Sequence, residues 1–405
     1  MTLEELHPDE NALRVGDSIE IDITNVANGG FCIGRHEGRV VFVRHALPGE
    51  RVVAEITEMT KKFLRADAIE VLTASEHRVD VPCGYAGTCG GCDWQHASVS
   101  YQRELKSAVV REQMSHLAKI ESISGVPLED FQVKSLRPID NGLRWRTRNR
   151  YSTIGNLGLG FKMNRSHTVI EIDDCLIAVE GSTELAQSGL NRARGDIETA
   201  QSSSGQHVIV DPRGGPWLDE KVGERSWRIH ASSFWQIHQD APEAFVSTVR
   251  SMANLRTGDS LLDLYSGSAL FAASLAGDVG ESGSVVAVES GIDAVRDARR
   301  SCSDLPQIDL VTADVAKWVK SNAETFDVVV LDPPRAGAGI EVIEAIGKIA
   351  RRTIVYVACE PSALARDTRV LLDQGWQLDR LEGFDAFPMT SHVECFALFT
   401  HPTRK

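Results

Sequence analysis

The sequence predicts an α/β protein in which a doubly wound, Rossmann-like sheet forms the C-terminal half. A small β-barrel and a central β-rich region precede it. Residues 14–72 read as short alternating strands separated by turn residues, and residues 127–230 continue with β-type runs and turns. From Ser232 onward strand-like runs alternate with helical ones, which is the rhythm of parallel βαβ units. A chain of 405 residues is long enough for several domains with buried cores.

The composition is that of an ordinary globular protein, with 42% apolar and 25% charged residues. Residues 1–17 lack the apolar core of a secretory signal, and no uninterrupted apolar run is long enough to cross a bilayer. We therefore expect a cytoplasmic protein that binds no membrane. In that compartment the eight cysteines indicate metal binding or catalysis before disulfides.

The charge is unevenly distributed along the chain. A net charge of −14 argues against a generic nucleic-acid binder. Residues 134–235 differ, with 14 Lys and Arg against 12 Asp and Glu. Within them arginines stand at alternate positions from Arg144 to Arg150, where they would line one face of a strand. Such a face can contact phosphates and bases, or it can be the solvated side of a sheet, and composition favours neither.

The N-terminal strands predict a small β-barrel of the oligonucleotide-binding type. Turn signals at Asn28-Gly29-Gly30, Glu37-Gly38 and Pro48-Gly49 separate them. The expected strands cover residues 18–24, 39–43, 51–56 and 66–71. An adaptor barrel of the SH3 type, with no contact to RNA, is the alternative.

A cysteine-rich loop follows the barrel, with Cys83, Cys89 and Cys92 spaced as C-x5-C-x2-C. Three cysteines within ten residues, with glycines between them, indicate a metal centre rather than inert thiols. The candidates for a fourth ligand are Cys175, Cys302, Cys359 and Cys395. Of these only Cys175 precedes the α/β domain, and it ends a strand-like run. The spacing alone leaves iron–sulfur and tetrahedral zinc open.

The α/β region shows the pattern of a nucleotide-type fold. A strand over residues 261–265 leads through a turn with one glycine, Gly267, into a helix over residues 270–276. The next strand ends at Glu289, where a carboxylate suits hydrogen bonds to a ribose diol. The missing G-x-G-x-x-G pattern disfavours NAD. Before this region, residues 100–120 predict a helix capped by Ser100.

Two further apolar runs each break at a chemically active residue. The run over residues 328–331 ends at Asp332, and the run over residues 354–358 ends at Cys359. In a parallel sheet both breaks lie at the carboxyl edge, so the two side chains would face one crevice. Cys359 also precedes a helix start at Pro361, where the helix N-terminus favours a thiolate. The alternative is a buried structural thiol.

Three motifs in order resemble the S-adenosylmethionine-dependent RNA uracil-C5 methyltransferase family. They are DPPRAG at 332–337, VYVACEPSALARD at 355–367 and FDAFPMTSHVE at 384–394. The run from Gly29 to Arg35, with the strand and turn after it, resembles the TRAM domain, an RNA-binding module. The likeness is to the iron–sulfur-bearing type that acts on 23S rRNA, and it covers nearly the whole chain. Three residues depart from the family pattern. Glu360 and Leu270 each stand where Asn is usual, and Met389 stands where Gln, His or Tyr is usual.

The resemblance implies three domains. A TRAM-like barrel would occupy residues 1–76. A central β-domain with the metal loop would occupy residues 77–99 and 127–233. A class I methyltransferase domain would occupy residues 100–126 and 234–405.

The resemblance also implies the site residues. Cys359 would be the nucleophile and Glu394 the base. The contacts to S-adenosylmethionine would come from Gln236, Tyr265, Glu289, Asp314 and Asp332. A [4Fe–4S] cluster, with zinc as the competing metal, would be held by Cys83, Cys89, Cys92 and Cys175.

These residues suit methylation of uracil, whose C5 is a poor nucleophile. A thiolate that adds to C6 places electron density on C5, and a base must later remove the C5 proton so that the thiolate can leave. We expect a monomer that methylates a uridine in RNA, with 23S rRNA favoured over tRNA. The alternatives are an RNA-binding protein with an inactive methyltransferase domain and an iron–sulfur electron carrier or radical enzyme. The last is disfavoured because C-x5-C-x2-C differs from the C-x3-C-x2-C spacing of radical enzymes.

Overall fold

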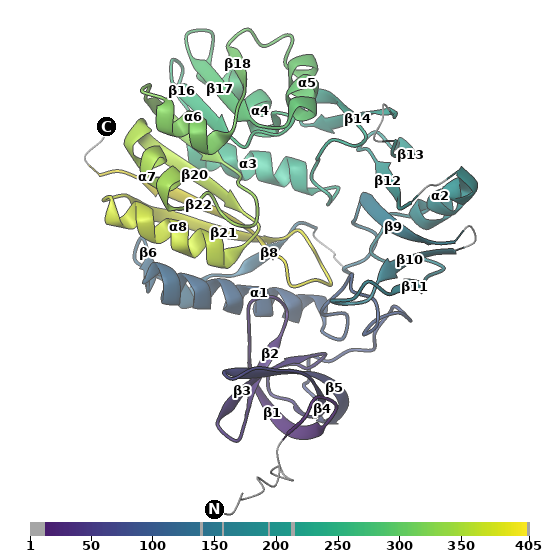
Figure 1. The fold of residues 1–405 in the computed structure, drawn as a ribbon. Helices are drawn as coiled ribbons and strands as arrows, with labels where there is room; N and C mark the ends of the chain where they lie inside the picture. The colour runs from purple at the N-terminus through teal and green to yellow at the C-terminus, as the bar shows by residue number, and fades with distance from the viewer. Residues whose placement is uncertain (1–12, 138–140, 156–157, 193–194, 212–214, 403–405) are drawn as a thin grey trace, which may run out of the picture.

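The computed structural model describes residues 13–137, 141–155, 158–192, 195–211 and 215–402 (Figure 1). Most of the N-terminal stretch that lacks a signal pattern lies outside these ranges. In Figure 1 the barrel lies at the bottom, helix α1 runs above it, and the large sheet and the central β-domain stand side by side at the top. No helix in the described ranges is long and apolar enough to span a membrane.

The N-terminal strands form a closed barrel in the order β1-β2-β3-β5-β4. The strands are β1 (Ser18–Val26), β2 (Cys32–His36), β3 (Arg39–Arg44), β4 (Arg51–Met59) and β5 (Phe63–Thr73). Alternate residues of β1, namely Ile19, Ile21 and Ile23, point into an aliphatic core because successive side chains of a strand face opposite sides. The barrel is confirmed, and β2 is a strand that the expected list lacks.

Helix α1 (Val99–Gln113) joins the barrel to the rest of the molecule and continues into a π-helical turn, η1 (Met114–Ala118). The prediction of Ser100 as the cap is wrong by two residues, since the N-cap position is Ser98, which makes no side-chain capping bond. The buried ammonium of Lys106 donates to the carboxylate of Asp385 and to the carbonyl of Phe387. A buried charge needs such partners, so α1 is fixed to the C-terminal domain.

The central β-domain contains a five-stranded sheet in the order β11-β10-β9-β12-β13, covered by α2 (Ser182–Gly189). Its strands are β9 (Arg148–Ile154), β10 (Gly158–Lys162), β11 (Val169–Glu171), β12 (Ile197–Gln201) and β13 (His207–Ile209). The short helical turn η3 (Leu190–Arg192) follows α2.

The alternating arginines contribute to the internal structure of this domain. Arg144 pairs with Asp174, and Arg150 pairs with Glu198. Arg148 donates to the carbonyls of Ala231 and Ser233 at 2.7 and 2.9 Å. The structure therefore favours a structural role for Arg144 and Arg148, whereas the side chain of Arg150 is 68% exposed and stays open to contact with phosphates.

The C-terminal domain is built on an eight-stranded sheet in the order β18-β17-β16-β19-β20-β22-β21-β8. The first five strands in this order are parallel, and β22 runs antiparallel between β20 and β21. The strands are β8 (Val133–Ser135), β16 (Ser260–Leu264), β17 (Ser284–Glu289), β18 (Ile308–Thr312), β19 (Phe326–Leu331), β20 (Ala350–Ala358), β21 (Gln377–Asp385) and β22 (Glu394–Thr400).

Helices cover both faces of this sheet, as a doubly wound fold requires (Figure 1). They are α3 (Ala241–Ala253), α4 (Leu270–Val279), α5 (Ile292–Ser301), α6 (Val315–Ser321), α7 (Ile340–Ile349) and α8 (Pro361–Asp373). The predicted helix starts at residues 270 and 361 are confirmed.

Two segments expected in the central domain pack on the C-terminal domain. Strand β8 pairs with β21. The hairpin of β14 (Trp217–Val222) and β15 (Arg225–His230) contributes Leu218, Trp227 and Ile229 to the core of the large sheet. The small elements β6 (Ser122–Ile123), β7 (Val126–Pro127) and η2 (Leu128–Asp130) connect η1 to β8. Both segments therefore belong with the C-terminal domain, although the expected boundaries place them in the central domain.

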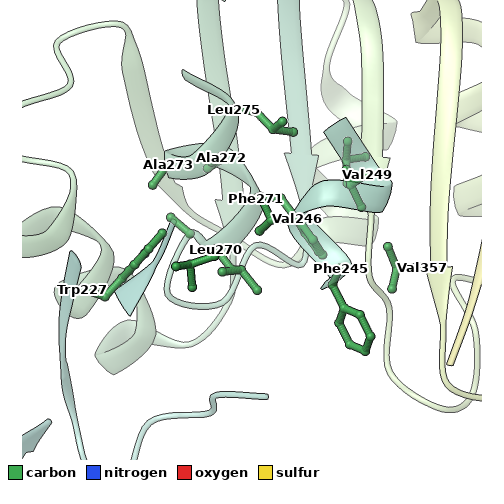
Figure 2. Packing of buried hydrophobic residues seen from close by; sticks show 14 of the residues in the cluster. Trp227, Phe245, Val246, Val249, Leu270, Phe271, Ala272, Ala273, Leu275 and Val357 are labelled. Atoms are coloured by element: carbon green, nitrogen blue, oxygen red, sulfur yellow. The ribbon is translucent and has the colours of Figure 1, made fainter. Parts of the chain in front are cut away.

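One hydrophobic core fills the space between the sheet and helices α3 and α4. Figure 2 shows Phe245 of α3 close to Val357 of β20, with Leu270 and Trp227 packed nearby. Leu270 is only 8% exposed. Burying a leucine side chain contributes about 1.5–3 kcal/mol, so the core accounts for an apolar residue at this position.

Candidate active site

Three of the predicted site residues meet at the carboxyl edge of the large sheet. Strands β19 and β20 are parallel neighbours with Leu331 opposite Tyr356, so Asp332 and Cys359 leave the sheet at the same edge. Strand β22 runs antiparallel to β20 with Cys395 opposite Ala358, which places Glu394 beside Cys359. The sheet register thus brings together residues that are 27, 35 and 62 positions apart in the chain.

The thiol of Cys359 is held in its neutral form. Burial raises the pKa of Cys359 to about 12, and the nearby carboxyls of Glu394 and Asp332 raise it further than the guanidinium of Arg335 lowers it. The N-terminus of α8 favours an anion by at most about 2 kcal/mol. The expectation of a thiolate stabilised by that helix end is therefore wrong for the ligand-free protein, because burial and two carboxyls outweigh the helix.

The carboxyl of Glu394 is also shifted toward its neutral form. Its side chain is 4% exposed, and burial and the charge of Asp332 raise its pKa well above the usual value. Burial raises the pKa of Asp332 to about 7. A carboxyl whose pKa is raised in this way is a stronger base once ionised, which suits proton removal near neutral pH.

Arg335 and His392 flank these carboxyls. The Nη2 of Arg335 donates to Nε2 of His392 at 3.2 Å. Burial and the charge of Arg335 lower the pKa of His392, so its imidazole is neutral at neutral pH. Arg335 is exposed and is the cation that opposes the raised pKa values of Cys359 and Glu394.

A tight turn after β16 forms a second part of the site. Three residues of the turn, Tyr265, Gly267 and Ala269, have positive φ angles of 60°, 54° and 63°. The carboxylate of Glu289, at the end of β17, accepts from the backbone N–H of Gly267 at 3.1 Å and of Gly291 at 2.6 Å. A Cβ atom added at Gly267 would meet nothing within 4 Å, so open space lies in front of the turn.

Two buried polar atoms beside this turn have no hydrogen-bond partner within the described ranges, Oδ1 of Asp263 and Oγ of Ser268. Buried polar groups without partners cost free energy, so their presence suits a polar ligand in the open space. Burial, followed by the charges of Asp332 and Glu289, raises the pKa of Asp263 to about 8 despite the N–H of Ala272. Asp263 is missing from the predicted site residues. Its signal in the sequence is a lone acid inside the apolar strand 261–264.

The two remaining predicted contacts to S-adenosylmethionine are Asp314 and Gln236, and neither has a hydrogen bond to the turn after β16 among the contacts described. Asp314 is exposed, caps α6 by accepting from the N–H of Lys317 at 2.9 Å, and raises the pKa of Tyr265 by its charge. Gln236 is half-buried in the segment that leads into α3. Its contact with a ligand stays a prediction.

The four predicted metal ligands line one cavity of about 130 Å³. Cys83, Cys89 and Cys92 reach it from the loop and Cys175 from the far side, with Arg146 in the wall. The loop backbone passes close to β10, since a Cβ at Gly90 would lie 2.9 Å from the carbonyl oxygen of Lys162. As placed, no three His, Cys, Asp or Glu side chains in the described ranges form a group that could hold a single metal ion. A metal centre therefore stays a prediction.

Comparison with known protein families gives two matches. Residues 12–69 match the model of the TRAM domain. Residues 196–401 match the model described as tRNA (uracil-5-)-methyltransferase. The first region contains the barrel up to residue 69 of β5, and the second contains the whole carboxyl edge described above.

Similar proteins are found along nearly the full length of the chain. An uncharacterised RNA methyltransferase of Streptomyces coelicolor is 38% identical, covering 95% of this chain and 93% of its own. The 23S rRNA (uracil(1939)-C(5))-methyltransferase RlmD of Shewanella denitrificans is 27% identical, covering 95% and 96%. The crystal structure of the Pyrococcus abyssi tRNA (uracil-54, C5)-methyltransferase with S-adenosyl-L-homocysteine superposes with a TM-score of 0.68 at 21% identity, covering 94% and 99%. That likeness shows a shared fold.

Proposed function

The chain belongs to the tRNA (uracil-5-)-methyltransferase family, and from that premise we propose that it methylates C5 of a uridine in 23S rRNA through a covalent bond between Cys359 and C6 of the base. It is an S-adenosylmethionine-dependent RNA uracil-C5 methyltransferase with a class I methyltransferase domain and an N-terminal TRAM barrel. The observation that carries the proposal is the meeting of Asp332, Cys359 and Glu394 at one edge of the sheet.

The proposed reaction begins at Cys359. The thiol gives up its proton to solvent, and the sulfur adds to C6 of the uracil ring, so that C5 gains electron density. C5 then attacks the methyl group of S-adenosylmethionine, the methyl–sulfonium bond breaks, and S-adenosylhomocysteine is the leaving group. The base must leave its stack to reach this edge, which favours a loop or locally opened RNA as substrate.

Glu394 completes the proposed reaction by removing the C5 proton. The electrons of the C5–H bond then re-form the C5–C6 double bond, and the C6–S bond breaks to release Cys359. Glu394 is only 4% exposed, and this burial keeps water away from the C5 proton that Glu394 removes. Asp332, between the two, is suited to orient the target base or the methyl donor.

The proposed donor site is the open space at the turn after β16. We assign to this donor site Tyr265, Glu289, Asp314 and Asp332, and also Gln236, which is half-buried in the segment before α3. The partnerless oxygens of Asp263 and Ser268 support a polar ligand at this place. The bonds of Glu289 to two backbone N–H groups fix its carboxylate for a ribose diol.

We further propose that Cys83, Cys89, Cys92 and Cys175 hold a [4Fe–4S] cluster. Four thiolates are the ligand set of such a cluster, and the four thiols line one cavity. Iron and acid-labile sulfide, with a visible absorption band in anaerobically purified protein, would support the cluster. Zinc alone would refute it.

The choice of 23S rRNA rests on the cysteine set and on the named relative from Shewanella denitrificans. The tRNA enzyme from Pyrococcus abyssi shares the fold and keeps tRNA as the second candidate. We further propose that the protein acts in the cytoplasm as a monomer.

The test incubates the protein with methyl-labelled S-adenosylmethionine and either 23S rRNA or tRNA transcripts. The proposal expects label on a uridine of 23S rRNA with wild-type protein and none with Cys359→Ala. Label on tRNA alone would reassign the substrate. Absence of label on both RNAs would favour the RNA-binding protein without activity.

A further inference from the structure

The loops that carry Cys359 and Glu394 are held by residues from the first hundred positions of the chain. One contact comes from the turn between β1 and β2 of the barrel. The other comes from the residues that directly follow Cys92 in the cysteine loop. Neither is part of the large sheet.

Asp93 makes the contact to the turn that precedes Glu394, the proposed general base. Its Oδ2 accepts from the backbone N–H and from the hydroxyl of Ser391, both at 2.9 Å. The N–H groups of Asp93 and Trp94 both donate to the carbonyl of Met389, at 2.9 and 3.0 Å. Ser391 lies three residues before Glu394, so Asp93 fixes the turn from which the base emerges.

The shape of that turn depends on these outside partners. Met389 has a φ angle of +67°, which a side-chain-bearing residue rarely adopts. Its N–H donates to Oε1 of Gln102, on α1, at 2.8 Å. Gln102 also donates to the carbonyls of Trp94 and Ala97. The buried residue Met389 is thus held between α1 and the cysteine loop by hydrogen bonds from both.

Asn28 makes the contact to the residue that follows Cys359, the proposed nucleophile. Its Nδ2 donates to Oε1 of Glu360, the residue after Cys359, at 2.6 Å. The same Oε1 accepts from the hydroxyl of Ser362 at 2.8 Å and from its N–H at 3.4 Å, which caps α8. Glu360 therefore links the barrel to the helix start behind the nucleophile.

The two contacts meet at Gly30. Its carbonyl accepts from Nε1 of Trp94 at 3.1 Å. Its φ angle is +86°, and a Cβ there would lie 3.1 Å from both Asp93 and Ser391. We call the set Asn28, Gly30, Asp93 and Trp94 the N-terminal clamp.

We propose that Asn28 and Asp93 are positioning residues of this clamp, Asn28 for Cys359 and Asp93 for Glu394. The proposal rests on the catalytic roles proposed above. It gives the barrel and the cysteine loop a part in the chemistry beyond holding RNA or metal. Methyl transfer then requires both to be docked on the C-terminal domain.

The two contacts have opposite signatures because Cys359 and Glu394 act at different steps. Cys359 forms the C6–S bond, and Glu394 takes the C5 proton so that this bond breaks. Loss of the Asn28 contact slows formation of the covalent protein–RNA complex. Loss of the Asp93 contact slows its breakdown, so the complex accumulates. A fold that is merely loosened slows both steps together.

The experiment measures the covalent protein–RNA complex on denaturing gels during single turnovers. It uses full-length protein, S-adenosylmethionine and whichever RNA accepts the label in the test of the proposed function. Asn28→Ala is expected to slow its formation, and Asp93→Ala its breakdown, each by up to about 100-fold. Asp93→Asn keeps an oxygen for Ser391 and should recover most of the wild-type rate. Ser391→Ala removes one of the two bonds and should show a smaller slowing of breakdown, which keeps the test open if Asp93→Ala does not fold.

Matched controls remove the same side chains elsewhere. Asn25→Ala removes an amide near the end of β1, three residues before Asn28, that bonds only the N–H of Val26 among the contacts described. Asp67→Ala removes a carboxylate that pairs with Arg44 on the outer face of the barrel. Both should keep wild-type formation and breakdown. Thermal midpoints and metal content, measured on every variant, separate positioning from loss of fold.

The proposal is overturned if Asp93→Ala, folded and with wild-type metal content, slows both steps equally or neither. It is also overturned if Asn28→Ala forms the complex at the wild-type rate. A wild-type protein that methylates RNA without any complex contradicts the proposed function instead, so the two failures are distinguishable.

Discussion

At the scale of single residues, Cys359 shows how burial sets chemistry. The sequence predicts the position of this thiol at a strand end, and the structure places Asp332 and Glu394 beside it. The sequence could not predict its protonation. A pKa of about 12 results from burial and two carboxyls that come from other strands. In the ligand-free protein the thiol is therefore neutral at neutral pH, and only a small fraction is present as the reactive thiolate.

This raised pKa predicts how Cys359 reacts with iodoacetamide in the ligand-free protein. Below its pKa the thiolate fraction rises about tenfold per pH unit, so the alkylation rate should climb from pH 7 to 9 without levelling. Mass spectrometry of the peptide that contains Cys359 distinguishes it from the other thiols. A rate that levels off below pH 8 would contradict the buried, acid-flanked environment.

Asp263 predicts a pH dependence of stability. Its pKa is about 3.9 in an unfolded chain and about 8 in the folded protein. The folded state binds the extra proton, so its contribution is complete below about pH 4 and is lost as the pH rises through about 8. In urea titrations between pH 5.5 and 8, Asp263→Asn should remove up to about 1.4 kcal/mol per pH unit from the decline in unfolding free energy. Equal slopes in both proteins would contradict this.

At the scale of elements, strand ends and helix starts were predictable because their signals are local. Apolar runs that break at Asp332 and Cys359, and the proline after Glu360, define β19, β20 and the start of α8. Long-range pairing was not predictable. Nothing near Val133 shows that β8 will pair with β21, about 250 residues later. The partners of Arg144 and Arg150 likewise come from other segments.

Leu270, the first residue of α4, allows an element-scale test. Family resemblance suggests Asn at this position, yet the side chain is 8% exposed within the core shown in Figure 2. Leu270→Asn should lower the unfolding free energy by about 2–5 kcal/mol, because it removes apolar contacts and buries an amide. Ile292→Asn, at the start of α5 and 68% exposed, is the control and should change it by less than about 0.5 kcal/mol. A neutral Leu270→Asn would show that the core tolerates the usual residue.

At the scale of the whole molecule, the N-terminal clamp joins three parts that the sequence presents as separate domains. The sequence predicts the barrel, the cysteine loop and the α/β domain from their own patterns. It carries no sign that Asn28 meets Glu360 or that Asp93 meets Ser391, since those partners are 332 and 298 positions apart. Domain order is local information, whereas domain docking is decided by surfaces that only the folded chain brings together.

We expect the cysteine loop to support this docking through the proposed metal centre. Cys83→Ser is expected to lose iron and to lower the thermal midpoint, because one ligand of the proposed centre is removed. Resistance of the loop to proteolysis should fall as well. A variant that is free of metal, folded and fully active would contradict a structural role for the centre.

The most direct test of the account uses RNA in which 5-fluorouridine replaces uridine. Glu394 cannot remove the fluorine from C5, so the reaction should stop with the base still bonded to the protein. Mass spectrometry should then find a methylated fluorouracil nucleotide on Cys359, dependent on S-adenosylmethionine and absent in Cys359→Ala. A bond at another residue, or methylation of natural RNA by Cys359→Ala, would contradict the account.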